Sequence, residues 1–362
     1  MTTFFFRRSV EKAFQLDEYP PGLSLNINKS LDGNAPYIIL AVDDIMYIVN
    51  TVVHRSVSTS QRNVMSSSVS SVERVLTGDF IGMIQRKMRD ESYPKAIVTG
   101  GFPPEDKIVQ FIVLINSLDM ANQYLSRIMG SRIVPSEDEP GSALPTEVLQ
   151  NAFSFEKDAI FVANELYSLQ NKFLNKSMEL LNEGVHRLFI EVVRARLRPV
   201  LTETFRDADY TLGEEELLEY ARQNDEEEDE VLDLVTRRFE QGWDRLMKPI
   251  ARLMTPGTFS SLLDTTANYL SKVLEKRVLS SSGRTSAYGA IRIERDFTGI
   301  VDIVARGDYR VREVFNKVTQ LMMVANMEDD EWEELLALDG EEAMEWVLTE
   351  EERTKARNLV RR

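Results

Sequence analysis

The sequence predicts an all-α protein, an elongated rod of consecutive helical bundles that ends in a small C-terminal helical cap. Three observations lead to this prediction. Apolar residues recur at intervals of three and four in long segments, which is the pattern of amphipathic helices. Pro, Gly and Ser gather between those segments, as they do in loops. No segment has the alternation of a convincing strand, and no repeat of fixed period is found.

Length and composition exclude several classes of protein. The chain has 362 residues, of which 43% are hydrophobic and 28% charged, as in a globular protein of two or three domains. The net charge of −16 disfavours nucleic acid as a partner. The sequence contains no Cys for a disulfide or a thiolate metal site. Because it has no long apolar run and its start is too charged for a signal peptide, we expect a cytosolic protein without a transmembrane segment.

The first bundle is expected to cover residues 1–101. It begins part-way into an apolar stripe without a clear cap, so we expect it to be the end of a longer rod. A loop rich in Pro, Gly and Asn follows the first helix, and Gly100-Gly101 with the two prolines after it marks the end of the bundle. Helices are predicted over residues 6–14, 42–57 and 66–90.

The main bundle is expected to cover residues 102–307. A loop is predicted over residues 131–145, a break between two helices at Asn182-Glu183-Gly184, and a kink at Pro199, which lacks a backbone donor. The acidic segment 213–230 is expected to be a solvated loop or helix face. Helices are predicted over residues 108–130, 153–181, 185–205, 231–254 and 259–279.

The small C-terminal helical domain is expected to cover residues 308–362. Its boundary lies inside the stretch 288–326, in which two helices with strong apolar stripes are predicted to meet at Gly307. Near the end of the chain, Thr349 followed three residues later by Glu352 fits the capping box that begins a helix.

The sequence offers no motif for catalysis, for a cofactor or for a metal. The patterns of zinc proteases and of phosphate-binding loops are absent, and the two histidines, His54 and His186, are expected to be structural. Asp43 and Asp44 are adjacent and cannot face one another on a helix, and the acidic run 225–230 lacks EF-hand spacing. We therefore predict a non-enzymatic protein with no cofactor. The alternative is an enzyme that acts through these carboxylates, which metal-dependent stabilisation would support.

Six motifs run through the chain in order, and together they carry a family resemblance. Their set resembles the C-terminal portion of subunit 4 of the conserved oligomeric Golgi (COG) tethering complex. None of them is a catalytic signature, so the resemblance lies in their order and spacing. They are FFFRRSVEKAFQLD, VDDIMYIVNTVVHRSVSTS, INSLDMANQYLSRI, GAIRIERDFTGIV, VREVFNKVTQLMMVAN and WVLTEEERTKAR.

The resemblance implies a fold and a role. The fold is that of the helical rods of multisubunit tethers, and the role is vesicle tethering at the Golgi in retrograde intra-Golgi transport. The implied partners are other COG subunits and Golgi SNAREs with their Sec1/Munc18-type regulator. The implied location is the cytosolic face of the Golgi membrane, as a peripheral membrane protein. A helical adaptor or scaffold of another trafficking tether or coat is the alternative.

The resemblance also implies one ion pair. In the family, a cation on the helix that matches residues 311–326 pairs with a carboxylate of the last helix, and this pair holds the terminal domain on the rod. The matching residues are Lys317 and Glu352. The family usually has Arg at the first position, and Lys cannot make the planar bidentate contact of Arg. The alternative for Glu352 is that it only completes the capping box of its own helix.

Five further residues are candidates for contacts at the surface. Arg292, Arg295 and Asp296 are expected to lie at the surface near the cap. Arg194 and Arg198 belong to a local basic cluster in an acidic chain. That cluster is expected either to contact a membrane or an acidic helix of a partner, or to pair internally with the acidic run 225–230.

Overall fold

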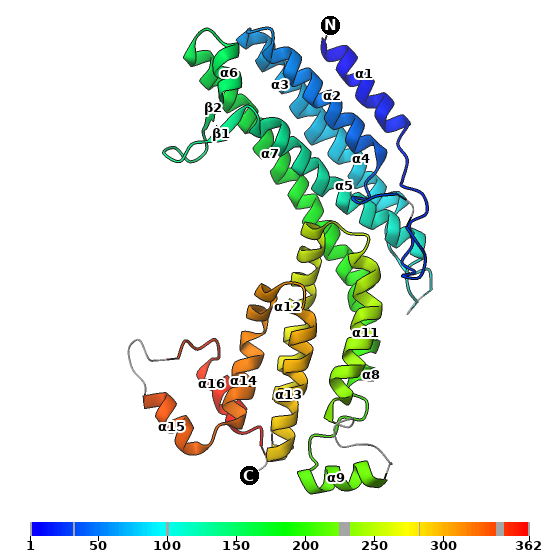
Figure 1. The fold of residues 1–362 in the computed structure, drawn as a ribbon, viewed down its shortest axis with the longest axis vertical. Coiled ribbons are helices and arrows are strands. Elements are labelled where there is room, and N and C mark those ends of the chain that lie inside the picture. The colour runs from blue at the N-terminus through cyan, green and yellow to red at the C-terminus, as the bar shows by residue number, and fades with distance from the viewer. Residues whose placement is uncertain are drawn as a thin grey trace. The chain divides into compact units, whose positions relative to one another are not determined.

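The all-α fold class is confirmed by the computed structural model (Figure 1), which describes residues 2–31, 33–98, 101–223, 232–281, 283–337 and 344–360. The first helical elements are α1 (Thr2–Gln15), α2 (Leu40–Val57), α3 (Arg62–Arg74), η1 (Val75–Phe80), α4 (Ile81–Arg86), η2 (Lys87–Glu91), α5 (Glu105–Gly130), α6 (Glu147–Ala152) and α7 (Glu156–Leu188). The later ones are η3 (Phe189–Val193), α8 (Arg194–Thr204), α9 (Glu214–Gln223), α11 (Leu234–Ala251), α12 (Pro256–Ser280), α13 (Ala287–Val304), η4 (Tyr309–Phe315), α14 (Asn316–Asn326), α15 (Asp329–Ala337) and α16 (Glu350–Arg357).

The chain forms two compact units. Unit 1 comprises Met1–Val192 and Pro249–Phe259, and unit 2 comprises Val193–Lys248 and Ser260–Arg362. The two units are defined by contacts within the folded chain, and the predicted main bundle, residues 102–307, is divided between them. The three-part division into residues 1–101, 102–307 and 308–362 and the rod-like arrangement stay predictions.

The core of unit 1 is built around α5. This helix is apolar on nearly all sides, and Phe111, Leu114 and Leu118 are fully or almost fully buried. A helix with so wide an apolar surface is stable only when other elements surround it. Accordingly α5 packs against α7 and α2, and α3 packs against α7 and α2. The apolar stripes that predicted these helices are therefore the buried faces of the unit.

The predicted helix over residues 66–90 is present, with two local departures from α-helical geometry. The segments η1 and η2 are π-helical turns on either side of α4. A π-helical turn accommodates an extra residue within a helix and redirects the side chains that follow it. In η2 this turn places Met88 in the core, at 4% exposure, and leaves the side chain of Arg89 exposed.

The break predicted at Asn182-Glu183-Gly184 is wrong, because α7 continues through it from Glu156 to Leu188. A Cβ at Gly184 would lie 2.6 Å from Cε of Met88 and 3.2 Å from Cγ1 of Ile115. The glycine therefore serves close packing between helices here rather than a turn. The sequence alone does not separate these two uses of glycine.

The loop predicted over residues 131–145 contains a small hairpin that the sequence analysis missed. Strand β1 (Ile133–Pro135) pairs in antiparallel register with β2 (Ala143–Pro145), and Gly141 has a φ of +105° in the turn between them. The apolar runs are only three residues long, which is too short for the alternation that marks a strand.

The segment between α11 and α12 is held in unit 1 by one buried amide. Asn116 on α5 is fully buried. Its Nδ2 donates to the carbonyls of Tyr37 and Leu253, at 3.1 and 2.7 Å, and its Oδ1 accepts from the N–H of Thr255 at 3.0 Å. One side chain thus joins three segments that are distant in sequence.

Arg252 holds the Pro- and Gly-rich loop that precedes α2. Its guanidinium donates four hydrogen bonds to backbone carbonyls of that loop, at 2.9 to 3.2 Å. The acceptors are the carbonyls of Ser24, Asn26, Ile27 and Lys29. These carbonyls have no helical partners, so the guanidinium supplies donors that they would otherwise lack.

In unit 2, α13 packs against α14 and α14 packs against α16. The two helices expected in the stretch 288–326 are present, joined through the 3-10 turn η4. Pro199 lies inside α8, and the helix continues through it. The hydrogen bonding departs from the α-helical pattern just before α8, in the π-helical turn η3.

Candidate functional site

Residues 345–357 dock onto one face of α14, and Lys317 is the first contact. Its Nζ lies 2.6 Å from Oε1 of Glu352 on α16 and 3.7 Å from Oε2 of Glu275 on α12. The side chains of Lys317, Glu352 and Glu275 are 29%, 23% and 19% exposed, so water only partly screens these contacts. The cation therefore bridges two carboxylates from two other helices.

Glu352 also completes the capping box of α16. Its Oε2 accepts from the N–H of Thr349 at 3.0 Å, while the hydroxyl of Thr349 accepts from the N–H of Glu352 at 3.3 Å. Both contacts considered for Glu352 are present, one through each of its oxygens. The cap also fixes the direction of the carboxylate that Lys317 meets.

The ion pair shifts the pKa values of both partners. The hydrogen bond from Lys317 lowers the pKa of Glu352, and the backbone N–H of Thr349 lowers it further. The same hydrogen bond to Glu352 raises the pKa of Lys317, and the charge of Glu275 acts in the same direction. Both groups are therefore charged across the neutral pH range.

Gln320 holds the extended segment before α16. This residue is 9% exposed and lies one turn after Lys317. Its Nε2 donates to the carbonyl of Glu345 at 2.9 Å, and its Oε1 accepts from the N–H of Val347 at 2.9 Å. The side-chain amide thus pairs with both polar groups of a backbone segment, in the manner of a neighbouring strand.

Arg357 holds the other end of α16. Its guanidinium donates to the carbonyls of Val324 and Met327, at the end of α14, and to the carboxylate of Asp329. Nearby, the rings of Trp332 and Trp346 meet edge to face with centroids 5.8 Å apart. The terminal segment is therefore joined to α14 and α15 by polar contacts at both ends and by an aromatic pair.

The expectation that Arg292 and Asp296 lie at the surface is wrong. Their exposures are 8% and 3%. Asp296 accepts a hydrogen bond of 2.7 Å from the hydroxyl of Tyr210, and Arg292 donates to the carbonyl of Asp209 at 2.9 Å. Helical spacing placed both on a charged face, but the segment before α9 covers that part of α13. Burial raises the pKa of Asp296 to about 6.

The same segment makes a close backbone contact with α13. A Cβ at Gly289 would lie 1.9 Å from the carbonyl oxygen of Tyr210, so only glycine fits there. The N–H of Ser286 donates to that same carbonyl at 3.0 Å, and the hydroxyl of Ser286 caps α13. These contacts hold the backbone of Tyr210 against the first turn of α13, and its side-chain hydroxyl reaches Asp296 further along the same helix.

The other predicted residues lie apart from this site. Arg295 is exposed and forms an ion pair with Asp233 at 2.6 Å. Arg194 is half-buried and Arg198 is exposed on α8. The acidic run 225–230 lies outside the described residues, so its proposed pairing with that cluster stays a hypothesis.

Sequence reasoning missed Gln320, Glu275, Arg357 and Tyr210. The signal for Gln320 was present, since it is a polar residue next to Leu321 on the buried side of α14. The others are ordinary charged or aromatic residues whose partners are distant in sequence, and no local pattern marks them.

Two findings concern other kinds of site. Within the described ranges, no group of three or more His, Cys, Asp or Glu side chains is placed to hold a metal ion. The helices described there also include none that is long and apolar enough to span a lipid bilayer.

The chain is similar to known proteins over nearly its whole length. It is 26% identical to conserved oligomeric Golgi complex subunit 4 of Arabidopsis thaliana, over 96% of this chain and 42% of that protein. The human protein of the same name is 20% identical over 91% of this chain and 40% of its own length. The chain thus spans about two-fifths of the length of these relatives.

A solved structure has a similar fold. The C-terminal domain of the exocyst subunit Sec6p superposes with a TM-score of 0.53 at 13% identity, over 92% of this chain and 76% of that one. At this identity the likeness concerns the fold alone.

Two family models match consecutive parts of the chain. The model of the middle α-helical bundle of the COG4 transport protein matches residues 1–88. The model of the C-terminal part of conserved oligomeric Golgi complex subunit 4 matches residues 111–355, which contain the contacts between Lys317 and Glu352 and around Gln320. This is a family of complex subunits and not of enzymes. The chain belongs to the family of conserved oligomeric Golgi complex subunit 4.

Proposed function

We propose that this chain acts as part of a non-enzymatic subunit of a Golgi vesicle-tethering complex, in retrograde intra-Golgi transport. It binds other subunits of the complex, Golgi SNAREs and their Sec1/Munc18-type regulator, as a peripheral protein on the cytosolic face of the Golgi membrane. The observation that carries this proposal is the match of two models of one family, in chain order, to residues 1–88 and 111–355. The assignment to a Golgi complex rests on the names of the relatives, which are subunits of the conserved oligomeric Golgi complex.

The docked C-terminal segment is proposed to form part of a binding surface. We propose that the contacts of Lys317, Gln320 and Arg357 keep residues 345–357 folded against α14, so that this part of unit 2 offers one fixed surface to a partner. A fixed surface binds with less loss of conformational freedom than a mobile one. We also propose the division of the chain into residues 1–101, 102–307 and 308–362, and the rod-like arrangement of helical bundles that the sequence predicts.

An affinity purification tests the proposal. The tagged chain is incubated with a Golgi-enriched lysate, and the recovered proteins are identified by mass spectrometry. We expect other subunits of the Golgi complex and SNARE machinery, which an unrelated helical protein of similar size and net charge does not recover. Recovery of components of another coat or tether instead would support the adaptor alternative. If neither group of proteins is recovered, the proposal is contradicted for this part of the subunit.

Charge reversal tests the basic cluster on α8. In the variant Arg194→Glu with Arg198→Glu, we expect weaker recovery of an acidic partner at unchanged helicity, because both side chains have solvent contact. Lys272→Glu with Lys276→Glu, two exposed residues at the same spacing on α12, is the matched control. Unchanged recovery in the double variant excludes this cluster as the binding surface.

A further inference from the structure

The short helix α15 in unit 2 has an apolar stripe that the described part of the chain leaves uncovered. Trp332, Leu335 and Leu336 follow the i, i+3, i+4 spacing and therefore lie on one side of the helix. None of the residues of α15 is buried, and Leu336 is 52% exposed. The stripe is thus open to solvent along its length.

The stripe continues onto the segment that precedes α16. The ring of Trp346 meets that of Trp332 edge to face, with the two centroids 5.8 Å apart, and both residues are half-buried. Gln320 fixes the backbone on both sides of Trp346, as described above. We call the surface formed by Trp332, Leu335, Leu336 and Trp346 the α15 face.

The α15 face lies on a helix that is short for its lack of packing. An isolated helix of nine residues is marginal in water, because few hydrogen bonds offset the cost of nucleation. Arg357 holds its beginning, since the guanidinium donates to Asp329 and lies 5.8 Å from the ring centroid of Trp332. A partner that covers the stripe therefore stabilises α15 as well as the complex.

Carboxylates surround the α15 face. Residues 328–337 contain no Lys or Arg and six acidic side chains, which are Glu328, Asp329, Asp330, Glu331, Glu333 and Glu334. Among the described residues, only Asp329 of these six forms an ion pair, with Arg357. At about 100° per residue, Glu331 and Glu333 lie on opposite sides of the stripe. An apolar surface bordered by unpaired carboxylates favours a ligand that has both apolar and basic side chains.

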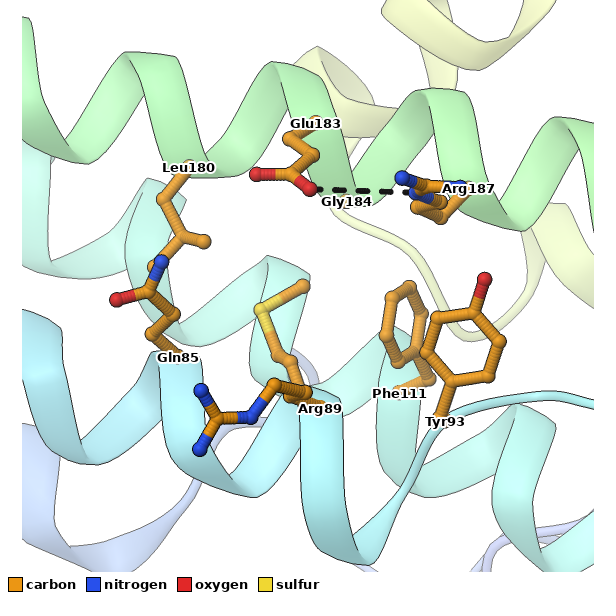
Figure 2. Close-up of a pocket in the computed structure, with 9 residues that line it drawn as sticks. Gln85, Arg89, Tyr93, Phe111, Leu180, Glu183, Gly184 and Arg187 are labelled. Atoms are coloured by element: carbon orange, nitrogen blue, oxygen red, sulfur yellow. Dashed lines mark ion pairs between the residues drawn. The ribbon is translucent and has the colours of Figure 1, made fainter.

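A pocket in unit 1 lacks this kind of complementarity. It has a volume of about 280 Å³ and lies between α7 and the π-helical turn η2 (Figure 2). Arg89 donates to Asp90 from both Nε and Nη2, and Arg187 lies 3.9 Å from Glu183. Each cation of that pocket thus stands with a carboxylate, so its charges select neither an anion nor a cation.

We propose that the α15 face binds a basic amphipathic helix of a partner protein, with its apolar side on Trp332 and Leu336 and its Lys or Arg side chains near Glu333. The inference rests on the contacts of unit 2 and does not depend on the Golgi role. Two amphipathic helices bury their stripes by packing against one another, and an aromatic anchor is common in binding hot spots.

The same carboxylates disfavour two other occupants. An anionic membrane surface is repelled by an acidic helix. In a two-fold dimer the same surface of both copies meets, so a second copy of this chain would place carboxylates against carboxylates. A basic partner helix is the occupant that satisfies both the stripe and the charges.

Peptide selection tests this proposal. A phage-displayed library of random 14-residue peptides is selected on the immobilised full chain, with counter-selection on the variant Leu336→Ser with Glu333→Lys. We expect enriched peptides that have Leu, Ile, Phe or Met at i, i+3, i+4 spacing together with Lys or Arg. The affinity of a synthetic copy is measured by fluorescence anisotropy, and circular dichroism should show that the peptide gains helix on binding.

Two substitutions, each with a matched control, locate the binding surface. Leu336→Ser should weaken binding about tenfold, whereas Leu144→Ser, at a leucine of unit 1 that is 54% exposed, should leave the affinity unchanged. Glu333→Lys should weaken binding about tenfold through repulsion of the basic peptide. Glu137→Lys, at an exposed residue of unit 1, changes the net charge equally and should have no effect. All four side chains are exposed, and equal thermal unfolding confirms that the variants are folded.

Contrary results overturn the proposal in distinct ways. No enrichment over the unselected library means that the α15 face binds no helical peptide. Enriched peptides without Lys or Arg, or an equal response to Glu333→Lys and Glu137→Lys, remove the local electrostatic selection. An affinity that does not respond to Leu336→Ser places the peptide elsewhere. Sedimentation of the chain alone gives the last outcome, because a dimer that Leu336→Ser dissociates would mean that a second copy covers this face.

Discussion

Lys317 and Glu352 form a contact of 2.6 Å between Nζ and Oε1, while the second oxygen of Glu352 accepts from the N–H of Thr349. The ion pair and the helix cap are thus made by one carboxylate. Because the cap holds the side chain in place, less rotamer freedom is lost when the ion pair forms.

The coupling between Lys317 and Glu352 is measurable in a double-mutant cycle. We expect Lys317→Met and Glu352→Gln to couple by about 0.5 kcal/mol or more, as contacting residues do. Gln at the N3 position keeps the capping box, so this cycle isolates the charge. The three tryptophans of the chain, Trp243, Trp332 and Trp346, all lie in unit 2, so urea unfolding followed by their fluorescence reports this unit.

The exposed pair of Glu351 and Lys355 on the same helix is the control for that cycle. Its two side chains are 78% and 55% exposed, so we expect little coupling. Equal coupling in both pairs would mean that the Lys317 contact is an ordinary surface ion pair. The Lys317 coupling should also be present at pH 7 and be lost as the pH falls below about 4.5, because the pKa of Glu352 is lowered in the folded chain.

Replacing Lys317 by Arg should stabilise unit 2. The planar guanidinium can contact Glu352 and Glu275 together, whereas Nζ is 2.6 and 3.7 Å from them. We expect the free energy of unfolding to rise by about 0.5–1 kcal/mol. Lys355→Arg in the exposed pair should have no effect. A lower stability of Lys317→Arg would show that the space beside α16 admits only the slender ammonium group.

Gln320→Ala should release the segment before α16. The variant leaves the carbonyl of Glu345 and the N–H of Val347 without their partner, which costs about 1–3 kcal/mol. Hydrogen exchange should increase at residues 345–348 and the fluorescence of Trp346 should shift to the red. Asn316→Ala, on the exposed side of the same helix, is the control. Unchanged exchange in this segment would show that the amide is not what holds it.

Gly289→Ala should destabilise unit 2 strongly. The new Cβ would lie 1.9 Å from a backbone oxygen, which cannot move without displacing the segment around Tyr210. We expect a loss of about 3 kcal/mol or more, as for severe overpacking. In contrast, nothing lies within 4 Å of a Cβ at Gly82 in α4, so Gly82→Ala should stabilise by about 0.5–1 kcal/mol. Thermal unfolding measures both, and equal effects would contradict this distinction.

The buried carboxyl of Asp296 should make stability depend on pH. Its pKa is raised by burial to about 6, so the folded chain holds a proton that the unfolded chain has released. Its stabilising effect is therefore present below about pH 4 and is lost as the pH rises through about 6. Asp296→Asn keeps an acceptor for the hydroxyl of Tyr210 but cannot titrate.

Relative to Asp296→Asn, the unmodified chain should therefore lose about 2 kcal/mol of stability between pH 4 and pH 6.5. Urea unfolding across this range measures the difference. A Tyr210→Phe variant should increase the pH dependence, because it removes a donor to the charged form. A constant difference between the two chains at all pH values would contradict a raised pKa.

The helices could be predicted from the sequence because their signal is local. The apolar stripe of residues 108–130 became α5, and the residues of that stripe are the core of unit 1. The capping box at Thr349 was predicted for the same reason, since both of its members lie within one turn. The pairing of Lys317 with Glu352 came from the family resemblance and not from spacing.

Other features could not be predicted, because a partner distant in sequence decides them. Gly184 and Gly307 are both glycines in helical stretches, yet one packs against Met88 inside α7 and the other follows the end of α13. Asp296 looks like a solvated helix residue until Tyr210 covers it.

The sequence by itself determined the helical class, most of the helices, the absence of catalytic motifs and the family. Periodicity, caps and breakers act within a few turns, so they are legible without tertiary contacts. Only the tertiary structure decided which charged residues are buried, which glycines are packing sites, and that Gln320 holds the segment before α16. Burial and electrostatic partners depend on segments that meet only after folding, because a residue's surroundings are set by contacts far along the chain.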